Sequence, residues 1–210
     1  MKNQLPVKNS EKVHGLYGLI VCGGKSSRMG TDKSMLVYYD IPHCHHLYEM
    51  LEPFCEKVFI SCNHEQEKNI DKRYATITDL PAFNNTGPMA SLLSAFTEFK
   101  NKDFLVIGCD YPFLNSIDIG NFLSSFKSTD LAAAFYNSPA ALYEPLLAYY
   151  NKTSSALLFE MYNNKEYSLQ HFLKKNNAIK FFPSNIESIK SIDTKEEFLE
   201  AKTLITSTGH

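Results

Sequence analysis

A short apolar run that ends in a glycine-rich loop constrains the fold of this chain more than any other feature. Leu16 to Cys22 is apolar throughout and bounded by glycines, which is typical of a buried strand in a parallel sheet. The next segment, residues 23–33, reads Gly-Gly-Lys-Ser-Ser-Arg-Met-Gly-Thr-Asp-Lys. Gly23 and Gly24 lack a Cβ, so their backbone N–H groups can approach an anion closely. The sequence therefore predicts a strand followed by an anion-binding loop.

Three cations in this loop, Lys25, Arg28 and Lys33, support that interpretation. A polyphosphate needs charge neutralisation, and arginine adds a forked pair of donors that matches phosphate oxygens. The loop matches neither Gly-x-x-x-x-Gly-Lys-Ser/Thr nor Gly-x-Gly-x-x-Gly, the two commonest phosphate-binding motifs. On the loop alone, a generic glycine-rich turn with surface charges is an open alternative.

Length, charge and cysteine usage limit the class of protein. A chain of 210 residues fits one domain, and a formal net charge of -2 gives no general attraction for nucleic acid. Five cysteines without a C-x-x-C pair predict reduced thiols, and the polar N-terminus does not resemble a secretory leader. No apolar run approaches the roughly 20 residues that cross a bilayer. We expect a cytoplasmic protein that binds neither nucleic acid nor membrane.

Prolines and glycines divide the chain into alternating strands and helices, which predicts an α/β fold with a mostly parallel sheet covered on both faces. We expect a flexible N-terminal extension over 1–14, one domain over 15–204 and a flexible tail over 205–210. Strands are predicted at 16–22, 57–62, 75–78, 104–109, 131–135, 142–147 and 179–182. Helices are predicted at 42–54, 88–100, from 116, at 153–162, 169–175 and, opened by a Thr194–Glu197 capping box, 194–204.

Three polar segments follow predicted strands and are expected at one edge of the sheet: the loop 23–33, the loop from Asp79 to Gly87, and Asp110. Open α/β sheets bind ligands at the carboxyl ends of their strands, because helix N-termini and glycine turns gather there. A carboxylate beside phosphate suits Mg²⁺, so Asp110 is a candidate metal ligand. An Asx turn or a helix cap is the alternative for this residue.

Four motifs occur in order along the chain. They are Cys22-Gly-Gly-Lys-Ser-Ser-Arg-Met-Gly-Thr-Asp-Lys-Ser-Met-Leu36, Thr78-Asp79, Thr86-Gly-Pro-Met-Ala-Ser91 and Cys109-Asp-Tyr-Pro112, with weaker echoes at Glu144-Pro-Leu146 and Ile192-Asp-Thr194. This set resembles the molybdenum cofactor guanylyltransferase family, although Cys22 stands where the family pattern usually has alanine. The resemblance implies a Rossmann-like three-layer fold with a mixed sheet, of the nucleotide-diphospho-sugar transferase type. It also implies an enzyme that joins GMP from GTP to molybdenum-loaded molybdopterin and releases pyrophosphate.

The resemblance assigns roles to individual residues. The expected nucleotide-binding residues are Val21, Cys22, Gly23, Gly24, Lys33, Asn63, Asp79, Gly87 and Asp110. The expected catalytic residues are Arg28, Lys33 and Asp110, and the expected ligands of Mg²⁺ are Asp110 and Asp193. Purely structural roles are the alternatives for three of them: Asn63 in a plain turn, Asp79 as a loop cap and Asp193 at the positive end of a helix.

The implied chemistry is in-line attack by a phosphate oxygen on the α-phosphorus of GTP. It needs positioning and charge neutralisation, which Arg28 and Lys33 supply to the departing pyrophosphate, and no covalent nucleophile. Expected partners are GTP, molybdopterin and, transiently, cofactor-insertion proteins or molybdoenzymes. The alternatives are a relative that uses CTP or a sugar phosphate, and a non-catalytic nucleotide or cofactor carrier. The run His43-Cys44-His45-His46 is expected to be a solvated helix start.

Overall fold

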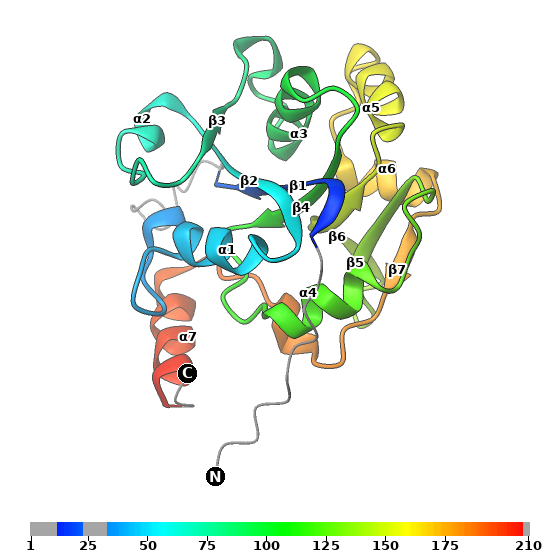
Figure 1. Cartoon of the computed structure of the whole chain (residues 1–210). Helices are drawn as coiled ribbons and strands as arrows, with labels where there is room; N and C mark the ends of the chain where they lie inside the picture. The colour runs from blue at the N-terminus through cyan, green and yellow to red at the C-terminus, as the bar shows by residue number, and fades with distance from the viewer. Residues whose placement is uncertain (1–11, 23–32, 208–210) are drawn as a thin grey trace.

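The computed structural model describes residues 12–22 and 33–207. Its centre is a seven-stranded sheet with the order β3-β2-β1-β4-β6-β5-β7 (Figure 1). The strands are β1 (Val13–Val21), β2 (Cys55–Cys62), β3 (Thr76–Thr78), β4 (Asp103–Gly108), β5 (Ala132–Asn137), β6 (Leu142–Tyr150) and β7 (Ile179–Phe181). Strand β1 pairs in parallel with β2 and β4, and β3 pairs in parallel with β2. Strand β6 runs antiparallel to both β4 and β5, so the predicted mixed, mostly parallel sheet is confirmed.

Helices cover both faces of this sheet, as the alternation of elements predicts (Figure 1). The helices are α1 (His43–Leu51), α2 (His64–Glu67), α3 (Pro88–Glu98), α4 (Ser116–Leu123), α5 (Ser154–Asn163), α6 (Leu169–Lys175) and α7 (Lys195–Ser207). Successive side chains of a strand point to opposite faces. Ile20 and Cys22 therefore pack in the core beneath α1 and α4, whereas Leu19 and Val21 pack in the core beneath α3, α5 and α6.

Both ends of the described chain are more ordered than the sequence suggests. Strand β1 begins at Val13, inside the predicted extension. Helix α7 continues to Ser207, past its predicted end at Leu204, because Ile205 is buried in a small cluster with Tyr38 and Ile192. The predicted capping box is confirmed: Thr194 Oγ1 accepts from the N–H of Glu197 at 3.2 Å, and Glu197 Oε2 accepts from the N–H of Thr194 at 2.9 Å.

The expected solvation of the histidine run is wrong. His43 is 1 % exposed and meets the ring of Tyr38 edge to face, and His45 is 5 % exposed and stacks on Tyr74. The segment before α1 folds over its first turn, where the N–H of His43 donates to Leu36 O at 2.8 Å. Burial lowers the pKa of His43 to about 3, so its imidazole is neutral at pH 7.

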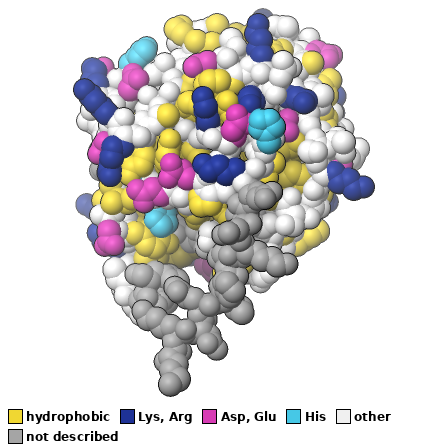
Figure 2. Space-filling model, in the orientation of Figure 1, with side chains coloured by type: hydrophobic (Ala, Val, Ile, Leu, Met, Phe, Trp, Pro, Cys, Tyr) yellow, Lys and Arg dark blue, Asp and Glu magenta, His cyan; other side chains and the backbone are white. Residues whose placement is uncertain are grey.

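The surface carries no dominant charge on the face seen in Figure 2, where lysine and arginine alternate with aspartate and glutamate. This distribution agrees with the small net charge of the chain. Among the residues that the structure describes, no helix has the length and apolar content that crossing a membrane requires.

Candidate active site

Four strands end at one edge of the sheet, and the predicted site residues follow them. Val21 of β1 pairs with Ser61 of β2 on one side and with Gly108 of β4 on the other. Cys62 in turn pairs with Thr78 of β3. The residues that follow these positions, Cys22, Asn63, Asp79 and Asp110, therefore lie along one edge. Gly23, Gly24 and Arg28 lie outside the described residues.

A row of thiols forms the last layer of the core beneath this edge. Cys62 ends β2, Cys22 and Cys109 directly follow β1 and β4 at the same level of the sheet, and Cys44 of α1 packs against them. Contact with the Cys109 and Cys44 thiols, together with burial, raises the pKa of Cys22 well above its ordinary value. The Cys22 side chain thus belongs to the core, and its backbone is the part that faces the edge.

Asp79 is held through both carboxylate oxygens. Ser61 Oγ donates to Oδ1 at 2.9 Å, and Ser91 Oγ of α3 donates to Oδ2 at 3.4 Å. Burial raises the pKa of Asp79 against the opposing effect of these two hydrogen bonds. Asp79 therefore ties β2 to α3 at the start of the loop that leads to Gly87.

Asn63 and Gly87 both shape the backbone of this edge. Asn63 Oδ1 accepts from the N–H groups of Glu65 and Gln66 at 2.9 Å each, and Gln66 Oε1 accepts from the N–H of Asn63. The Asn-x-x-Gln pattern is a capping-box signal that was overlooked in the sequence, and it explains helix α2. Gly87 precedes Pro88 with φ 62°, a conformation that favours glycine.

Asp110 contrasts with Asp79, because its Oδ1 is buried and has no hydrogen-bond partner among the described residues. Burial raises the pKa of Asp110 to about 6, against the opposing effects of a backbone hydrogen bond and of the positive charge of Lys33. The helix-cap alternative is wrong, because Asn115 Oδ1 caps α4 through the N–H groups of Ile117 and Asp118. A buried carboxylate oxygen without a donor is a natural position for a cation.

The carboxylate of Asp110 packs directly over Gly108. A Cβ at residue 108 would lie 2.5 Å from Asp110 Oδ1 and 3.1 Å from Tyr111 Cε2. The first distance is far below van der Waals contact and the second is slightly too short, so a side chain at residue 108 would force the Asp110 carboxylate to move. Gly108 is therefore as much a part of the site as the aspartate itself.

The C-terminal segment brings a carboxylate and a carbonyl to the same edge. Lys33 Nζ donates to Asp193 Oδ1 at 2.5 Å and to Ile192 O at 3.0 Å. The N–H of Ile192 donates to Asp110 O at 2.8 Å, which fixes the segment beside β4. Thr194 caps α7, so the carboxylate of Asp193 pairs with Lys33 and does not cap the helix.

Tyr111 and Glu144 belong to the same neighbourhood and were not assigned roles from the sequence. Tyr111 Oη donates to Glu144 Oε2 at 3.0 Å, and Asn137 Nδ2 donates to Glu144 Oε1 at 3.4 Å. The signal in the sequence was the weak Glu144-Pro-Leu146 echo. This motif does not reveal the contact, because Tyr111 follows the end of β4 whereas Glu144 lies near the start of β6.

The donors at this edge fit a magnesium ion. Asp110 offers a carboxylate oxygen that no described residue contacts by a hydrogen bond, and the exposed Asp193 lies close enough for its charge to raise the pKa of Asp110. Mg²⁺ uses one or two carboxylates together with phosphate and water oxygens, without a cage of protein ligands. No group of three or more His, Cys, Asp or Glu side chains in the described part of the chain could hold a metal by itself.

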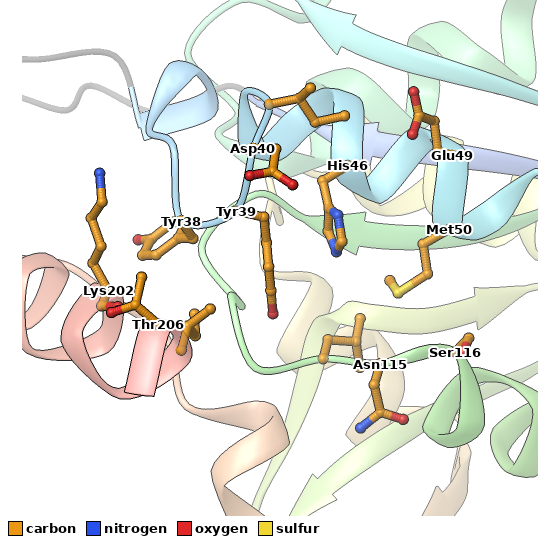
Figure 3. A pocket seen from close by; sticks show the side chains of 13 residues that line it. Tyr38, Tyr39, Asp40, His46, Glu49, Met50, Asn115, Ser116, Lys202 and Thr206 are labelled. Carbon is orange, nitrogen blue, oxygen red and sulfur yellow. The ribbon is translucent and has the colours of Figure 1, made fainter. Parts of the chain in front are cut away.

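A separate hollow of about 610 Å³ lies between α1, α7 and the segment 36–42. Tyr39 and His46, whose rings stack at 4.1 Å, project into it, and Asp40, Glu49 and Lys202 stand around it (Figure 3). None of the predicted site residues lines it. The candidate active site is therefore the sheet edge at Asp110, and this hollow is a separate feature of the surface.

Comparison with known proteins places this geometry in context. Residues 18–179 match the family model described as MobA-like NTP transferase domain. A molybdenum cofactor biosynthesis bifunctional protein from Synechocystis is 27 % identical over 184 residues, covering 87 % of this chain and 52 % of that protein. The chain thus spans about half the length of this relative. A probable molybdenum cofactor guanylyltransferase from Clostridium perfringens is 28 % identical over 196 residues, covering 87 % of this chain and 96 % of that one.

The fold has a counterpart among solved structures. Molybdopterin-guanine dinucleotide biosynthesis protein A from Archaeoglobus fulgidus superposes with a TM-score of 0.74 at 20 % identity, covering 91 % of this chain and 99 % of that one. This likeness shows the fold, which is the nucleotide-diphospho-sugar transferase type that the sequence predicts.

Proposed function

Since the chain belongs to the family of MobA-like NTP transferase domains, we propose that it transfers GMP from GTP to the phosphate of molybdenum-loaded molybdopterin. Family membership makes the protein a nucleotidyltransferase, as predicted. The choice of GTP and molybdopterin rests on the names of the relatives from Clostridium perfringens and Archaeoglobus fulgidus. The observation that carries the proposed site is the buried Oδ1 of Asp110 at the carboxyl edge of the sheet, which has no hydrogen-bond partner among the described residues.

The proposed reaction forms one bond and breaks one bond at the α-phosphorus. An oxygen of the acceptor phosphate attacks in line, and the bond to the bridging oxygen of pyrophosphate breaks. This acceptor is already anionic at neutral pH, so no side chain has to remove a proton from it. Catalysis then depends on holding the two phosphates together and on neutralising their charge.

The described residues divide this work. Asp110 and Asp193 would hold Mg²⁺, which when bound neutralises phosphate charge. Lys33 lies between Asp193 and the edge, with its ammonium held in place by two acceptors, and its charge serves the departing pyrophosphate. The backbone of Val21 and Cys22, the turn at Gly87, and Asn63 and Asp79 would position the nucleotide. Gly23, Gly24 and Arg28 complete the proposed set from the loop.

Guanylyl transfer can be tested directly with α-labelled GTP and molybdenum-loaded molybdopterin. We expect labelled dinucleotide and unlabelled pyrophosphate in the presence of Mg²⁺, and little product when CTP replaces GTP. Transfer from CTP alone would show a cytidylyl specificity in the same site. No transfer from either nucleotide at any Mg²⁺ concentration would contradict the proposal.

A nucleotide carrier that lacks catalysis is the competing function. Thermal unfolding distinguishes it, because a ligand that binds the folded state stabilises it by mass action. A protein that GTP stabilises, but that never forms the dinucleotide, would be a carrier. For the enzyme, we expect the Asp110→Ala variant to lose transfer while it keeps most of its stabilisation by GTP.

A further inference from the structure

The side chain of Tyr111 forms one wall of the position that Asp110 occupies. The Asp110 carboxylate and the Tyr111 ring crowd the same point above Gly108, where an added Cβ would lie 2.5 Å from one and 3.1 Å from the other. The Tyr111 side chain is 4 % exposed and cannot rotate freely in this space. Its orientation therefore limits where the Asp110 carboxylate can lie.

Glu144 fixes that orientation from the neighbouring strand. In the antiparallel register, Ile107 pairs with Leu147, which brings the start of β6 beside the end of β4. Glu144 Oε2 accepts from Tyr111 Oη at 3.0 Å, and its Oε1 accepts from Asn137 Nδ2 at 3.4 Å. Each carboxylate oxygen of Glu144 thus accepts a hydrogen bond from a neighbouring side chain.

From this geometry we propose that Glu144 is a positioning residue, which holds Tyr111 against Asp110 and thereby fixes the carboxylate that binds the divalent cation. The inference rests on the proposed function, because it takes Asp110 as the metal ligand. Glu144 does not touch the metal or the nucleotide. Groups that orient a metal ligand in this way typically change metal affinity by about 10-fold to 100-fold when they are removed.

A double-mutant cycle with Mn²⁺ as the probe tests this role. Mn²⁺ accepts the same oxygen ligands as Mg²⁺, and its electron paramagnetic resonance signal reports binding without any turnover. We expect Tyr111→Phe and Glu144→Ala each to weaken Mn²⁺ binding by about 10-fold. The double variant should also lose about 10-fold, because the two residues act as one unit. Glu144→Gln keeps an acceptor for Tyr111 Oη and should retain tighter binding than Glu144→Ala.

Tyr149→Phe is the matched control. Tyr149 Oη donates to a carboxylate oxygen of Asp103 at 2.9 Å, at the opposite end of β4. Removal of this hydroxyl should leave Mn²⁺ binding unchanged. Thermal unfolding of each variant identifies any that do not fold. If Glu144→Ala is unfolded, Glu144→Gln, which preserves the shape of the side chain, is compared with the wild type instead.

The outcomes separate this inference from the proposed function. Mn²⁺ binding that is unchanged in Tyr111→Phe and Glu144→Ala, or that falls about 100-fold in the double variant by simple addition, would overturn the positioning role. So would an absence of Mn²⁺ binding to the wild-type protein. Wild-type protein that shows the coupled loss, but transfers no GMP, would support the positioning role and contradict the proposed function.

Discussion

Asp79 and Asp110 follow two strands of the same sheet edge, yet the protein holds them in opposite ways. Asp79 has a hydroxyl donor on each carboxylate oxygen, from Ser61 and Ser91. Asp110 has one oxygen that is buried without any donor in the described structure. Burial raises the pKa of both. This difference supports the proposal that Asp110 would hold the cation, whereas Asp79 would shape the edge where the nucleotide lies.

The burial of the Asp110 carboxylate lowers the stability of the folded protein. A buried carboxylate without a partner destabilises the folded state, and proteins keep such groups mainly where function requires them. The folded-state pKa of Asp110, about 6, lies above its ordinary value of 3.8. Its contribution to stability is therefore fully present only below pH 3.8 and is lost as the pH rises through 6.

The largest expected effect is on turnover when Asp110 loses its charge. Asp110→Asn should reduce GMP transfer by about 1000-fold, because stabilisation by a bound metal amounts to several kcal/mol. Its thermal midpoint at pH 7 should equal or exceed that of the wild type, since the ionised buried group is gone. The control is Asp118→Asn in α4, where the carboxylate pairs with Asn115 away from the edge. A rate of GMP transfer by Asp110→Asn within 10-fold of the wild-type rate would contradict the different roles given to Asp110 and Asp79.

The next effect concerns the space above Gly108. Gly108→Ala places a methyl group 2.5 Å from Asp110 Oδ1, so the carboxylate must move. A displacement of about 1 Å costs about 100-fold in rate, and we expect a loss of this size in GMP transfer. Gly120→Ala is the control, because its added Cβ would lie 3.7 Å from the nearest atom, in Phe54. Equal rates in the two variants would show that Asp110 tolerates displacement.

A smaller effect is expected at Asp79, and it should appear in stability. Asp79→Ala leaves the hydroxyls of Ser61 and Ser91 without their acceptor, which costs about 1–3 kcal/mol. For a chain of this length, each kcal/mol lowers the thermal midpoint by about 2–4 °C. Lys68→Ala, at an exposed pair with Glu65, should change stability by less than about 0.5 kcal/mol. A midpoint for Asp79→Ala equal to that of Lys68→Ala would remove the structural role assigned to Asp79.

The smallest effect is a pH dependence of cation binding. Protons compete with the cation for Asp110 below its pKa of about 6. Mn²⁺ binding measured without nucleotide should therefore weaken by about 10-fold between pH 7.5 and pH 5, because only about one carboxylate in ten stays ionised at pH 5. Asp79→Asn should show the same pH dependence. A flat profile would mean that Asp110 does not control the affinity.

The arrangement of the edge could be predicted from the sequence because it depends on local signals. A short apolar run before residue 23 and a proline after Asp110 mark the strand ends, and parallel strands bring those ends together. The pairing of Lys33 with Asp193 joins residues 160 positions apart, and no local pattern encodes it. The same holds for Tyr111 and Glu144, whose contact depends on the antiparallel register of β6.

The local sequence pattern also did not reveal which side chains of the histidine run and of α7 are buried. A histidine-rich helix start is polar in composition, and its burial follows from the segment 36–42 folding over α1. The extension of α7 to Ser207 likewise follows from the contact of Ile205 with the cluster around Tyr38. In both places a contact between segments distant in the sequence decides the structure, and the local secondary-structure propensity does not.

Binding of Mn²⁺ without nucleotide, compared between Asp110→Asn and Asp79→Asn, tests the central contrast most directly. Paramagnetic resonance counts the bound ion at each step of a titration and does not require the acceptor. We expect Asp79→Asn to bind Mn²⁺ as the wild type does and Asp110→Asn to lose binding by at least about 10-fold. Wild-type affinity in Asp110→Asn, or a greater loss in Asp79→Asn, would contradict the assignment of the metal to Asp110.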